Sequence, residues 1–295
     1  MGTTLDAVQD RCRLPSSGPV TCAVSGGADS LALLVLACDA GLDVTAVHVD
    51  HGLRAGSGAE ADIVAAAAAR FGARFRAGRV EVAPGGDLEA RARAARRDVL
   101  GPDALYGHTA DDQAETVLLA LLRGSGLDGL AAMRTEHHPL LRLRRSETHA
   151  LCAELDLTPV RDPSNDDRRF RRNRVRAEVL PLLDDVAERD VVPLLCRLAD
   201  LARDDVDLLD DLAGGLDPRD APALAAAPVP LARRAVRGWL RALQPEGHPP
   251  DAAAVARVLA VAAGDATGTE VAGGVRVRRR DQRLHADGPR SEGDR

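Results

Sequence analysis

The sequence predicts an α/β fold with a parallel sheet, followed by a helical linker and a small C-terminal α+β domain. In the first half, short apolar runs alternate with helical patterns, which is typical of strands and helices in a parallel sheet. A Gly/Pro cluster at residues 214–218 then interrupts the helical patterns. Two helical patterns and a segment with a hairpin signal follow. We therefore expect a first domain over residues 1–185, a linker over 186–215 and a C-terminal domain over 216–295.

The elements of the first domain follow from the apolar spacing. An apolar run at residues 20–24 predicts the first strand, and a Gly/Ser turn separates it from a helix over 29–40. Leu31, Leu34 and Val35 mark the buried side of that helix. Further strands are expected at residues 42–49, 74–82 and 104–107, and further helices at 57–72, 88–100 and 112–122.

The C-terminal domain has a different order of elements. Helical patterns cover residues 233–243 and 252–263. The Gly273-Gly274 pair then predicts a hairpin within residues 269–286.

The composition excludes several chemistries. The chain has 295 residues and a net charge of −6, from 39 basic and 45 acidic residues, and every basic residue is an arginine. The absence of lysine excludes a Walker A phosphate loop and a Schiff-base lysine. Aromatic residues make up 2% of the chain, which argues against nucleic-acid binding through a row of stacked rings.

The cysteines and the N-terminus indicate a cytoplasmic protein. The five cysteines are widely spaced and never form C-x-x-C, so neither a disulfide framework nor a zinc or iron–sulfur site is indicated. The N-terminus lacks the apolar core of a signal peptide, and no run approaches the roughly 18 apolar residues of a membrane span. We expect no membrane association, and the sequence leaves the oligomeric state open.

A glycine-rich loop after the first strand is the strongest motif. Its residues are Ser25, Gly26, Gly27, Ala28, Asp29 and Ser30. A strand, such a loop and a helix N-terminus together form an anion site, because backbone N–H groups and the helix dipole both attract phosphate. The alternative is a tight turn in which Asp29 and Ser30 cap the helix.

Two further groups of polar residues follow strands. His48, Asp50 and His51 lie at the carboxyl end of the second strand, where open sheets bind ligands. The alternative is a strand histidine followed by a turn aspartate.

The second group lies at the helix after the fourth strand. Asp112 and Glu115 share one face of that helix, and the preceding His108 could contact a substrate. Mg²⁺ is usually held by one or two carboxylates together with phosphate oxygens, so the pair could bind it. The alternative is a capping box with Asp112 as the N-cap and Glu115 three residues on.

These motifs together resemble the bacterial tRNA(Ile)-lysidine synthetase family of PP-loop ATP pyrophosphatases. The resemblance is carried by S-G-G-A-D-S from Ser25, H-V-D-H-G-L from His48, G-H-T-A-D-D-Q-A-E-T from Gly107, L-L-R-G-S-G from Leu121, G-L-A-A-M from Gly129, P-L-L from Pro139, D-P-S-N from Asp162 and R-N-R-V-R from Arg172. It covers residues 20–185 in order and spacing. It implies an adenine-nucleotide α-hydrolase-like domain, use of ATP and Mg²⁺, and transfer of L-lysine to the CAU anticodon of tRNA(Ile).

The resemblance also implies site residues. ATP is expected at Ser25, Gly26, Gly27, Ala28, Asp29, Ser30, His48, Asp50, His51 and His108. Catalytic roles are implied for Asp29, Asp112, Glu115 and Arg174, with Asp29, Asp112 and Glu115 organising Mg²⁺ or the lysine amine.

Two arginine-rich stretches are candidate tRNA surfaces. On a helix, Arg168, Arg172 and Arg176 share one face, with Arg174 beside them, and such a stripe supplies phosphate contacts. On an alternating strand, Arg276, Arg278 and Arg280 share one side, opposite Val275 and Val277. The alternative for the first stretch is a solvated arginine face paired with nearby acids.

Three rival interpretations differ in the residues that they need. A related tRNA-thiolating enzyme would need a reactive cysteine pair or an iron–sulfur site, and no C-x-x-C is present. Amide-forming relatives share the first loop but not the D-P-S-N and R-N-R-V-R motifs. A non-catalytic nucleotide-sensing or RNA-binding module would not need Asp29, Asp112 and Glu115.

Overall fold

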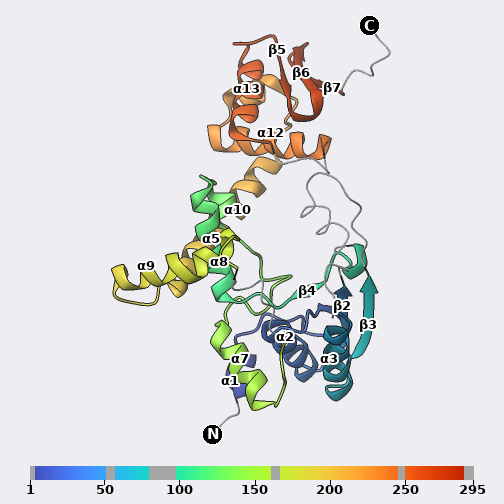
Figure 1. Ribbon diagram of the computed structural model, residues 1–295. Helices are drawn as coiled ribbons and strands as arrows, with labels where there is room; N and C mark the ends of the chain where they lie inside the picture. Colours follow the sequence, from blue (N-terminus) through green and yellow to red (C-terminus); the bar gives the residue numbers. More distant parts are fainter. Residues whose placement is uncertain (1–3, 51–56, 80–97, 161–166, 245–249, 289–295) are drawn as a thin grey trace. The chain divides into compact units, whose positions relative to one another are not determined.

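The computed structural model describes residues 4–50, 57–79, 98–160, 167–244 and 250–288 (Figure 1). Contacts within the chain divide it into two compact units, Met1–Ala202 and Arg203–Arg295. This division falls inside a long helix, α10 (Val192–Gly214). The boundary expected near residue 215 stays a prediction. Each unit has a hydrophobic core of its own.

The first unit contains a four-stranded parallel sheet, as predicted. Its strands are β1 (Pro19–Ala23), β2 (Asp43–Asp50), β3 (Arg74–Arg79) and β4 (Leu105–Tyr106), in the order β3-β2-β1-β4. Each neighbouring pair is parallel. The chain adds two strands on one side of β1 and then returns to its other side. The strand order therefore switches direction beside β1, which is where open α/β sheets bind ligands at the carboxyl ends of their strands.

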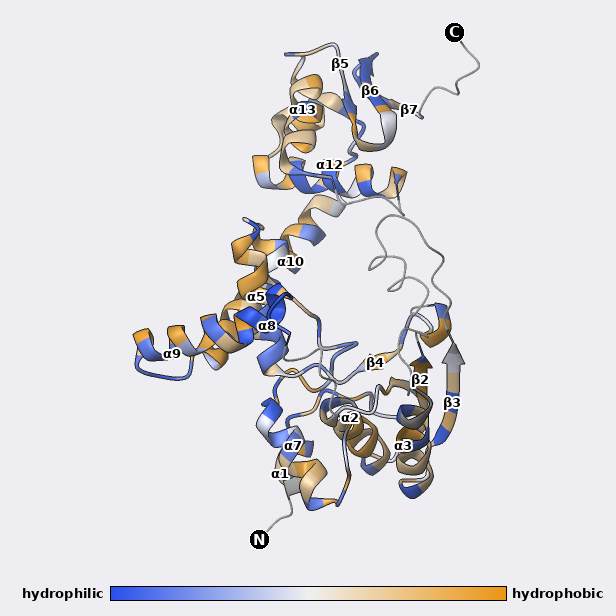
Figure 2. Ribbon diagram, viewed as in Figure 1, coloured by the Kyte–Doolittle hydropathy of each residue, from blue (hydrophilic) through white to orange (hydrophobic). Residues whose placement is uncertain are grey.

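The core of this unit forms around α2 (Ala28–Asp39), with α3 (Ser57–Arg70) as the next crossover helix. Leu31, Leu33 and Leu34 of α2 have no exposed surface, and Figure 2 shows how strongly apolar residues concentrate in α2 and β2. This packing fixes the N-terminus of α2 at the edge where the loop after β1 lies. The helix expected at residues 88–100 falls mostly outside the described residues, and residues 98–100 are helical.

The helix after β4 begins earlier than predicted. It is α5 (Ala110–Leu122), and Thr109 rather than Asp112 is its N-cap. The Asp112 carboxylate accepts hydrogen bonds from the backbone N–H and the hydroxyl of Thr109, at 2.9 and 3.1 Å. The interpretation of Asp112 as an N-cap with Glu115 closing a capping box is therefore wrong. Glu115 lies one turn further along α5 and does not cap the helix.

The remaining helices of the first unit complete the surroundings of α5. They are α1 (Thr4–Gln9), α6 (Leu127–Leu130), α7 (Arg145–Glu154), α8 (Arg171–Arg174), a π-helix (Val175–Val179) and α9 (Leu180–Ala187). Val175 and Leu180 pack with Ala114 and Leu118 in a small core of their own, which places the π-helix against α5.

The second unit is a small α+β domain. Its helices are α11 (Ala221–Ala226), α12 (Val229–Leu243) and α13 (Ala252–Ala263). They are followed by β5 (Gly268–Val271), a 3₁₀ turn (Ala272–Gly274), β6 (Val275–Arg280) and β7 (Arg283–Asp287), which form an antiparallel sheet. The Gly273-Gly274 hairpin is thus present, and both glycines have positive φ. Among the described residues, no helix combines the length and the apolar character that a membrane span needs.

Candidate active site

The phosphate loop connects β1 to α2. The backbone N–H of Ser25 donates to the Ser30 hydroxyl at 3.1 Å, and that hydroxyl donates to the carbonyl of Gly27 at 2.9 Å. Gly26 has a φ of 90°, which favours glycine. Gly27 is the N-cap of α2 and supplies no capping side chain, so the alternative with Asp29 and Ser30 as caps is not what forms. Ser30 closes the loop on itself and leaves an anion-binding geometry at the helix N-terminus.

The end of β4 touches this loop directly at Gly107. A Cβ atom on Gly107 would lie 2.5 Å from the carbonyl oxygen of Asp29 and 2.9 Å from the nitrogen of Ser30. Those are backbone atoms, which have no side-chain freedom with which to move away. Glycine at this position therefore allows the loop and the strand leading to His108 to meet.

The three predicted carboxylates converge on one arginine, Arg145 at the start of α7. Its guanidinium lies 2.9 Å from Asp112 Oδ1, 3.3 Å from Glu115 Oε1 and 3.5 Å from Asp29 Oδ2. Asp29 also accepts a hydrogen bond from the hydroxyl of Thr148, one turn further along α7. One guanidinium thus links the phosphate loop to α5.

Two more arginines reach the same cluster from the other side. Arg172 of α8 donates to Glu115 Oε2 at 2.7 Å and to Asp112 Oδ1 at 3.1 Å. Arg176 of the π-helix donates to Glu115 Oε1 at 2.7 Å. Three guanidiniums therefore face three carboxylates, and the formal charge of this buried cluster is zero.

The environment separates the two aspartates electrostatically. Burial raises the pKa of Asp29 above its ordinary value, even though Thr148 and Arg145 act in the opposite direction. Burial would also raise the pKa of Asp112, but Arg145, the Thr109 N–H, His108 and Arg172 together hold it below the ordinary value. Asp112 is thus fixed in its ionised form, whereas the site stabilises a negative charge on Asp29 less than on Asp112.

The cluster does not present a ready metal cage. Within the described ranges, no group of three or more His, Cys, Asp or Glu side chains is arranged to hold a metal ion. Asp29 fits Mg²⁺ best, because its side chain keeps 26% exposure beside the phosphate loop and supplies the oxygen donor that Mg²⁺ prefers. Asp112 keeps 10%, and Glu115 is fully enclosed by arginines.

The predicted histidines have different surroundings. His48 is buried, and its Nδ1 lies 3.0 Å from the carbonyl oxygen of Val24, so it packs inside the sheet edge. Asp50 ends β2, and His51 lies outside the described residues. His108 is part-exposed, with its Nδ1 3.0 Å from Nδ1 of His138. Burial, together with His108 and His137, lowers the pKa of His138 to about 3, so His138 is neutral at neutral pH.

The arginine stripe predicted on one helical face is not a single face. Arg168 lies in the turn before α8, so the helical spacing does not include it. Arg168 and Arg174 both pair with Glu178 on the exposed side, at 3.3 and 2.9 Å. Arg172 and Arg176 point instead into the carboxylate cluster. Whether these arginines contact tRNA stays a prediction.

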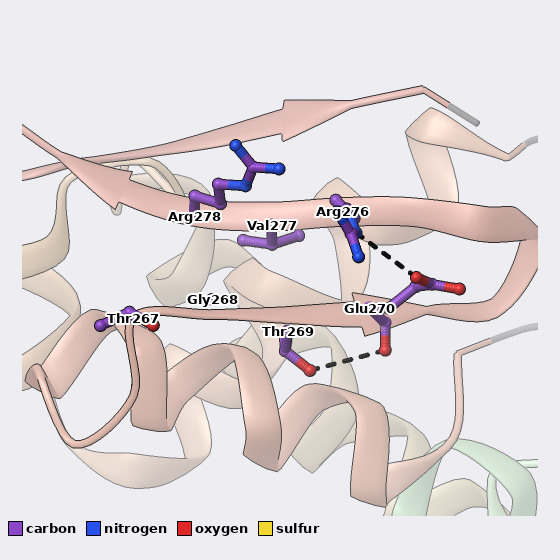
Figure 3. A pocket seen from close by; sticks show the side chains of 7 residues that line it. All are labelled: Thr267, Gly268, Thr269, Glu270, Arg276, Val277 and Arg278. Carbon is purple, nitrogen blue, oxygen red and sulfur yellow. Dashed lines mark hydrogen bonds and ion pairs between the residues drawn. The ribbon is translucent and has the colours of Figure 1, made fainter. Parts of the chain in front are cut away.

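The second predicted arginine surface lies on β6. Its burial alternates, with Val275 and Val277 buried and Arg276, Arg278 and Arg280 exposed. Beside it lies a pocket of about 380 Å³ between β5 and β6, where Arg276 approaches Glu270 at 3.5 Å (Figure 3). The strand pattern therefore has the side-chain orientation that the alternation predicted.

Sequence reasoning missed Arg145 and Thr148. Both lie just after the P-L-L motif. One feature could have indicated Arg145: it occupies the first turn of α7, where the helix dipole disfavours a cation. A cation at such a position needs an acidic partner from elsewhere. The neighbouring Arg144 is explained the same way, since it pairs with Asp111 at 3.0 Å.

The strand order, the phosphate loop and the carboxylates at the sheet edge define the chain as a PP-loop protein that uses ATP. The PP-loop domain family matches residues 5–183, and the family described as TilS substrate binding domain matches residues 220–285. The chain is 48% identical over 245 residues to the tRNA(Ile)-lysidine synthase of Nocardia farcinica, covering 77% of each chain. The identity to the tRNA(Ile)-lysidine synthase of Mycobacterium tuberculosis is 45% over 240 residues, covering 74% of each chain. This chain belongs to the tRNA(Ile)-lysidine synthase family.

A solved structure supports the fold alone. The U34-tRNA thiolase NcsA from Methanococcus maripaludis, solved with its 4Fe–4S cluster, superposes with a TM-score of 0.54 at 16% identity. The match covers 68% of this chain and 78% of that chain. The cysteines of this chain do not follow a cluster pattern: all five are free, and burial raises the pKa of Cys22 to about 12.

Proposed function

We propose that this chain uses ATP to join L-lysine to the wobble cytidine of the CAU anticodon of an isoleucine tRNA. In the first step, the C2 carbonyl oxygen of the cytidine bonds to the α-phosphorus of ATP, and pyrophosphate leaves with the bridging oxygen. In the second step, the ε-amine of lysine bonds to C2 and loses a proton, while the C2–O bond breaks and AMP leaves. The product is lysidine, which pairs with the codon AUA instead of AUG.

The observation that carries this proposal is the contact between the phosphate loop and the carboxylate cluster at one edge of the sheet. Asp29 belongs to the loop, Asp112 and Glu115 belong to α5, and Arg145 touches all three. A phosphate group bound at the N-terminus of α2 would lie beside Asp29 and the guanidinium of Arg145. The site would thus hold a phosphate next to groups that can orient a second, polar reactant.

Mg²⁺ is part of the proposal. Asp29 is the side chain that would hold it, and Mg²⁺ would supply positive charge to the pyrophosphate as it leaves. Asp29 has to be ionised for this role, and burial makes it the more easily protonated of the two aspartates.

We assign tRNA binding to two exposed sets of arginines. Arg168 and Arg174 lie outside the carboxylate cluster in the first unit, and Arg276, Arg278 and Arg280 lie on β6. Exposed guanidiniums contact phosphates without reading bases, so these sets supply affinity and orientation. The second set lies within the segment matched by the substrate-binding family.

The test is direct. The purified protein is incubated with ATP, Mg²⁺, labelled lysine and a tRNA(Ile) transcript bearing CAU, and label in acid-precipitable RNA is counted. We expect label that depends on ATP and that is lost in Asp29→Ala. A methionine tRNA transcript with the same anticodon serves as the specificity arm and should stay unlabelled.

A negative result would be informative about the reaction class. If the authentic tRNA takes no lysine but the protein still exchanges pyrophosphate into ATP, the nucleotide site is active and another acceptor or nucleophile is used. If neither occurs, the chain is a nucleotide-binding module without chemistry.

A further inference from the structure

Glu115 is unlike the other two carboxylates in its enclosure. Its side chain has 0% exposure, against 10% for Asp112 and 26% for Asp29. It lies on the buried face of α5, between α7 on one side and the α8 and π-helix segment on the other.

Both oxygens of Glu115 are already filled by arginines. Oε1 accepts from Arg176 Nε at 2.7 Å and from Arg145 Nη1 at 3.3 Å. Oε2 accepts from Arg172 Nε at 2.7 Å and from Arg176 Nη2 at 3.3 Å. A carboxylate offers about four lone-pair sites, so these contacts leave none for a metal ion.

The guanidiniums of Arg172 and Arg176 each contact the carboxylates through one edge. The opposite edge of each guanidinium makes no such contact. Arg172 and Arg176 use Nε and Nη2 toward Glu115 and Asp112. In the part of the chain that the structure describes, the Nη1 group of neither one has a hydrogen-bond partner. Their side chains keep 39% and 33% exposure, so these donors lie in partly open surroundings.

A π-helix carries Arg176, directly after α8, which carries Arg172. Val175–Val179 continues α8 with a wider turn, and Arg172 and Arg176 both reach one carboxylate while Arg174 faces away toward Glu178. Such wide turns are rare and occur often at functional sites. Val175 anchors the segment by its burial against α5.

We infer that Glu115 is a positioning residue that holds Arg172 and Arg176 as a phosphate-binding fork, and that it is not a ligand of Mg²⁺. Guanidinium suits this because its planar set of donors can bind a carboxylate on one edge and a phosphate on the other. The inference rests on the proposed function for its two phosphate sources, ATP and the tRNA backbone.

The experiment compares Glu115→Gln with the double variant Arg172→Gln/Arg176→Gln. Calorimetry measures ATP binding over a range of Mg²⁺ concentrations, and a filter assay measures binding of the tRNA transcript over a range of salt concentrations. Both variants should weaken the same phosphate ligand by about tenfold or more, the loss expected for charged hydrogen bonds. The Mg²⁺ concentration that half-saturates ATP binding should stay unchanged.

Arg171→Gln is the matched control. Arg171 is exposed on the same helix, and its substitution removes one positive charge where the double variant removes two, so it should leave both bindings as they are. Thermal melting followed by circular dichroism checks folding. If Glu115→Gln or the double variant fails to fold, the single variants Arg172→Gln and Arg176→Gln test the fork, because each leaves Glu115 paired with Arg145 and one further arginine.

The two phosphate sources give different results. A shallower salt dependence of tRNA binding in the double variant assigns the fork to the tRNA backbone. Weaker ATP binding with an unchanged salt dependence assigns it to ATP. Wild-type binding of both ligands by the double variant, or a higher Mg²⁺ requirement in Glu115→Gln alone, would overturn the inference. These are binding measurements, so a wild-type protein that forms no lysidine would overturn the proposed function without affecting them.

Discussion

Two groups of arginines in this chain are held in opposite ways. Arg145, Arg172 and Arg176 each contact at least two acidic side chains of a buried, charge-balanced cluster. Arg276, Arg278 and Arg280 are exposed on β6, and Arg276 approaches one exposed acid, Glu270. The same residue type therefore serves two different physical roles in one protein.

The difference lies in when water is removed. The carboxylates Asp112 and Glu115 lose most of their hydration during folding, so the guanidiniums that pair with them are oriented before any substrate arrives, and salt screens these pairs less. The guanidiniums on β6 stay hydrated, and on the proposed tRNA surface they would gain affinity by releasing counterions from the nucleic acid, which depends strongly on salt. Catalysis needs the first kind of arginine, and docking of a large polyanion needs the second.

Arg145→Ala should give the largest effect. It leaves three carboxylates facing two arginines, so buried negative charge is uncompensated, and we expect a loss of about 3 kcal/mol in the free energy of unfolding. Lysine transfer should fall below detection. Urea denaturation and the lysine assay measure the two effects, and Arg142→Ala, an exposed arginine three residues earlier, is the control. Similar losses in both variants would contradict the special role of the cluster.

Gly107→Ala tests how tightly the first unit is fitted together. The added Cβ would press on backbone atoms of Asp29 and Ser30, so we expect about 1–3 kcal/mol of destabilisation and weaker ATP binding. Gly126→Ala is the control, because a Cβ there meets no atom within 4 Å. Calorimetric ATP titration compares the two variants. Equal affinities for ATP would mean that the phosphate loop shifts to accommodate the added Cβ atom.

Removing the three β6 arginines together should affect binding and leave stability alone. In Arg276→Ala/Arg278→Ala/Arg280→Ala, we expect the slope of log K for tRNA against log salt to become shallower by about two to three. The melting temperature should change little, because the side chains are exposed. Arg233→Ala, an exposed arginine on α12, is the reference for loss of a single charge. An unchanged slope in the triple variant would remove β6 from the tRNA surface.

The smallest expected effect comes from Asp217, an exposed acid in the second unit. The backbone N–H of Arg219 and the guanidinium of Arg283, 2.7 Å away, lower its pKa in the folded state. Its contribution to stability is therefore present above the ordinary pKa of aspartate and is lost as the pH falls through the lowered value. Asp217→Asn should cost less than about 1 kcal/mol at neutral pH and nothing in strong acid. Urea midpoints at the two pH values measure this, and a pH-independent difference would contradict it.

The parts of this molecule that the sequence predicted well are those that depend on neighbouring residues. The apolar runs and the Gly/Ser turn specify β1, the phosphate loop and α2 locally, so the fold and the loop could be predicted together. The alternation of Val275 and Val277 with arginines likewise specifies the face of β6.

The parts that it missed depend on distant contacts. Arg145 meets Asp29 across more than a hundred residues of chain, and no local pattern encodes that meeting. The single arginine face expected over Arg168, Arg172 and Arg176 failed at Arg168, which precedes the helix, whereas Arg172 and Arg176 do share a face toward Glu115. The N-cap of α5 was misplaced because Thr109 competes with Asp112 for that position and wins through its hydroxyl and backbone geometry.

The close approach of Gly107 to the phosphate loop has a consequence for the speed of ligand capture. With the two backbones in contact, the loop and the end of β4 behave as one body, so the loop has little conformational freedom left to lose when a nucleotide arrives. A site of this kind is preformed in the absence of its ligand. Nucleotide association should then be limited by diffusion into the site rather than by rearrangement of the loop.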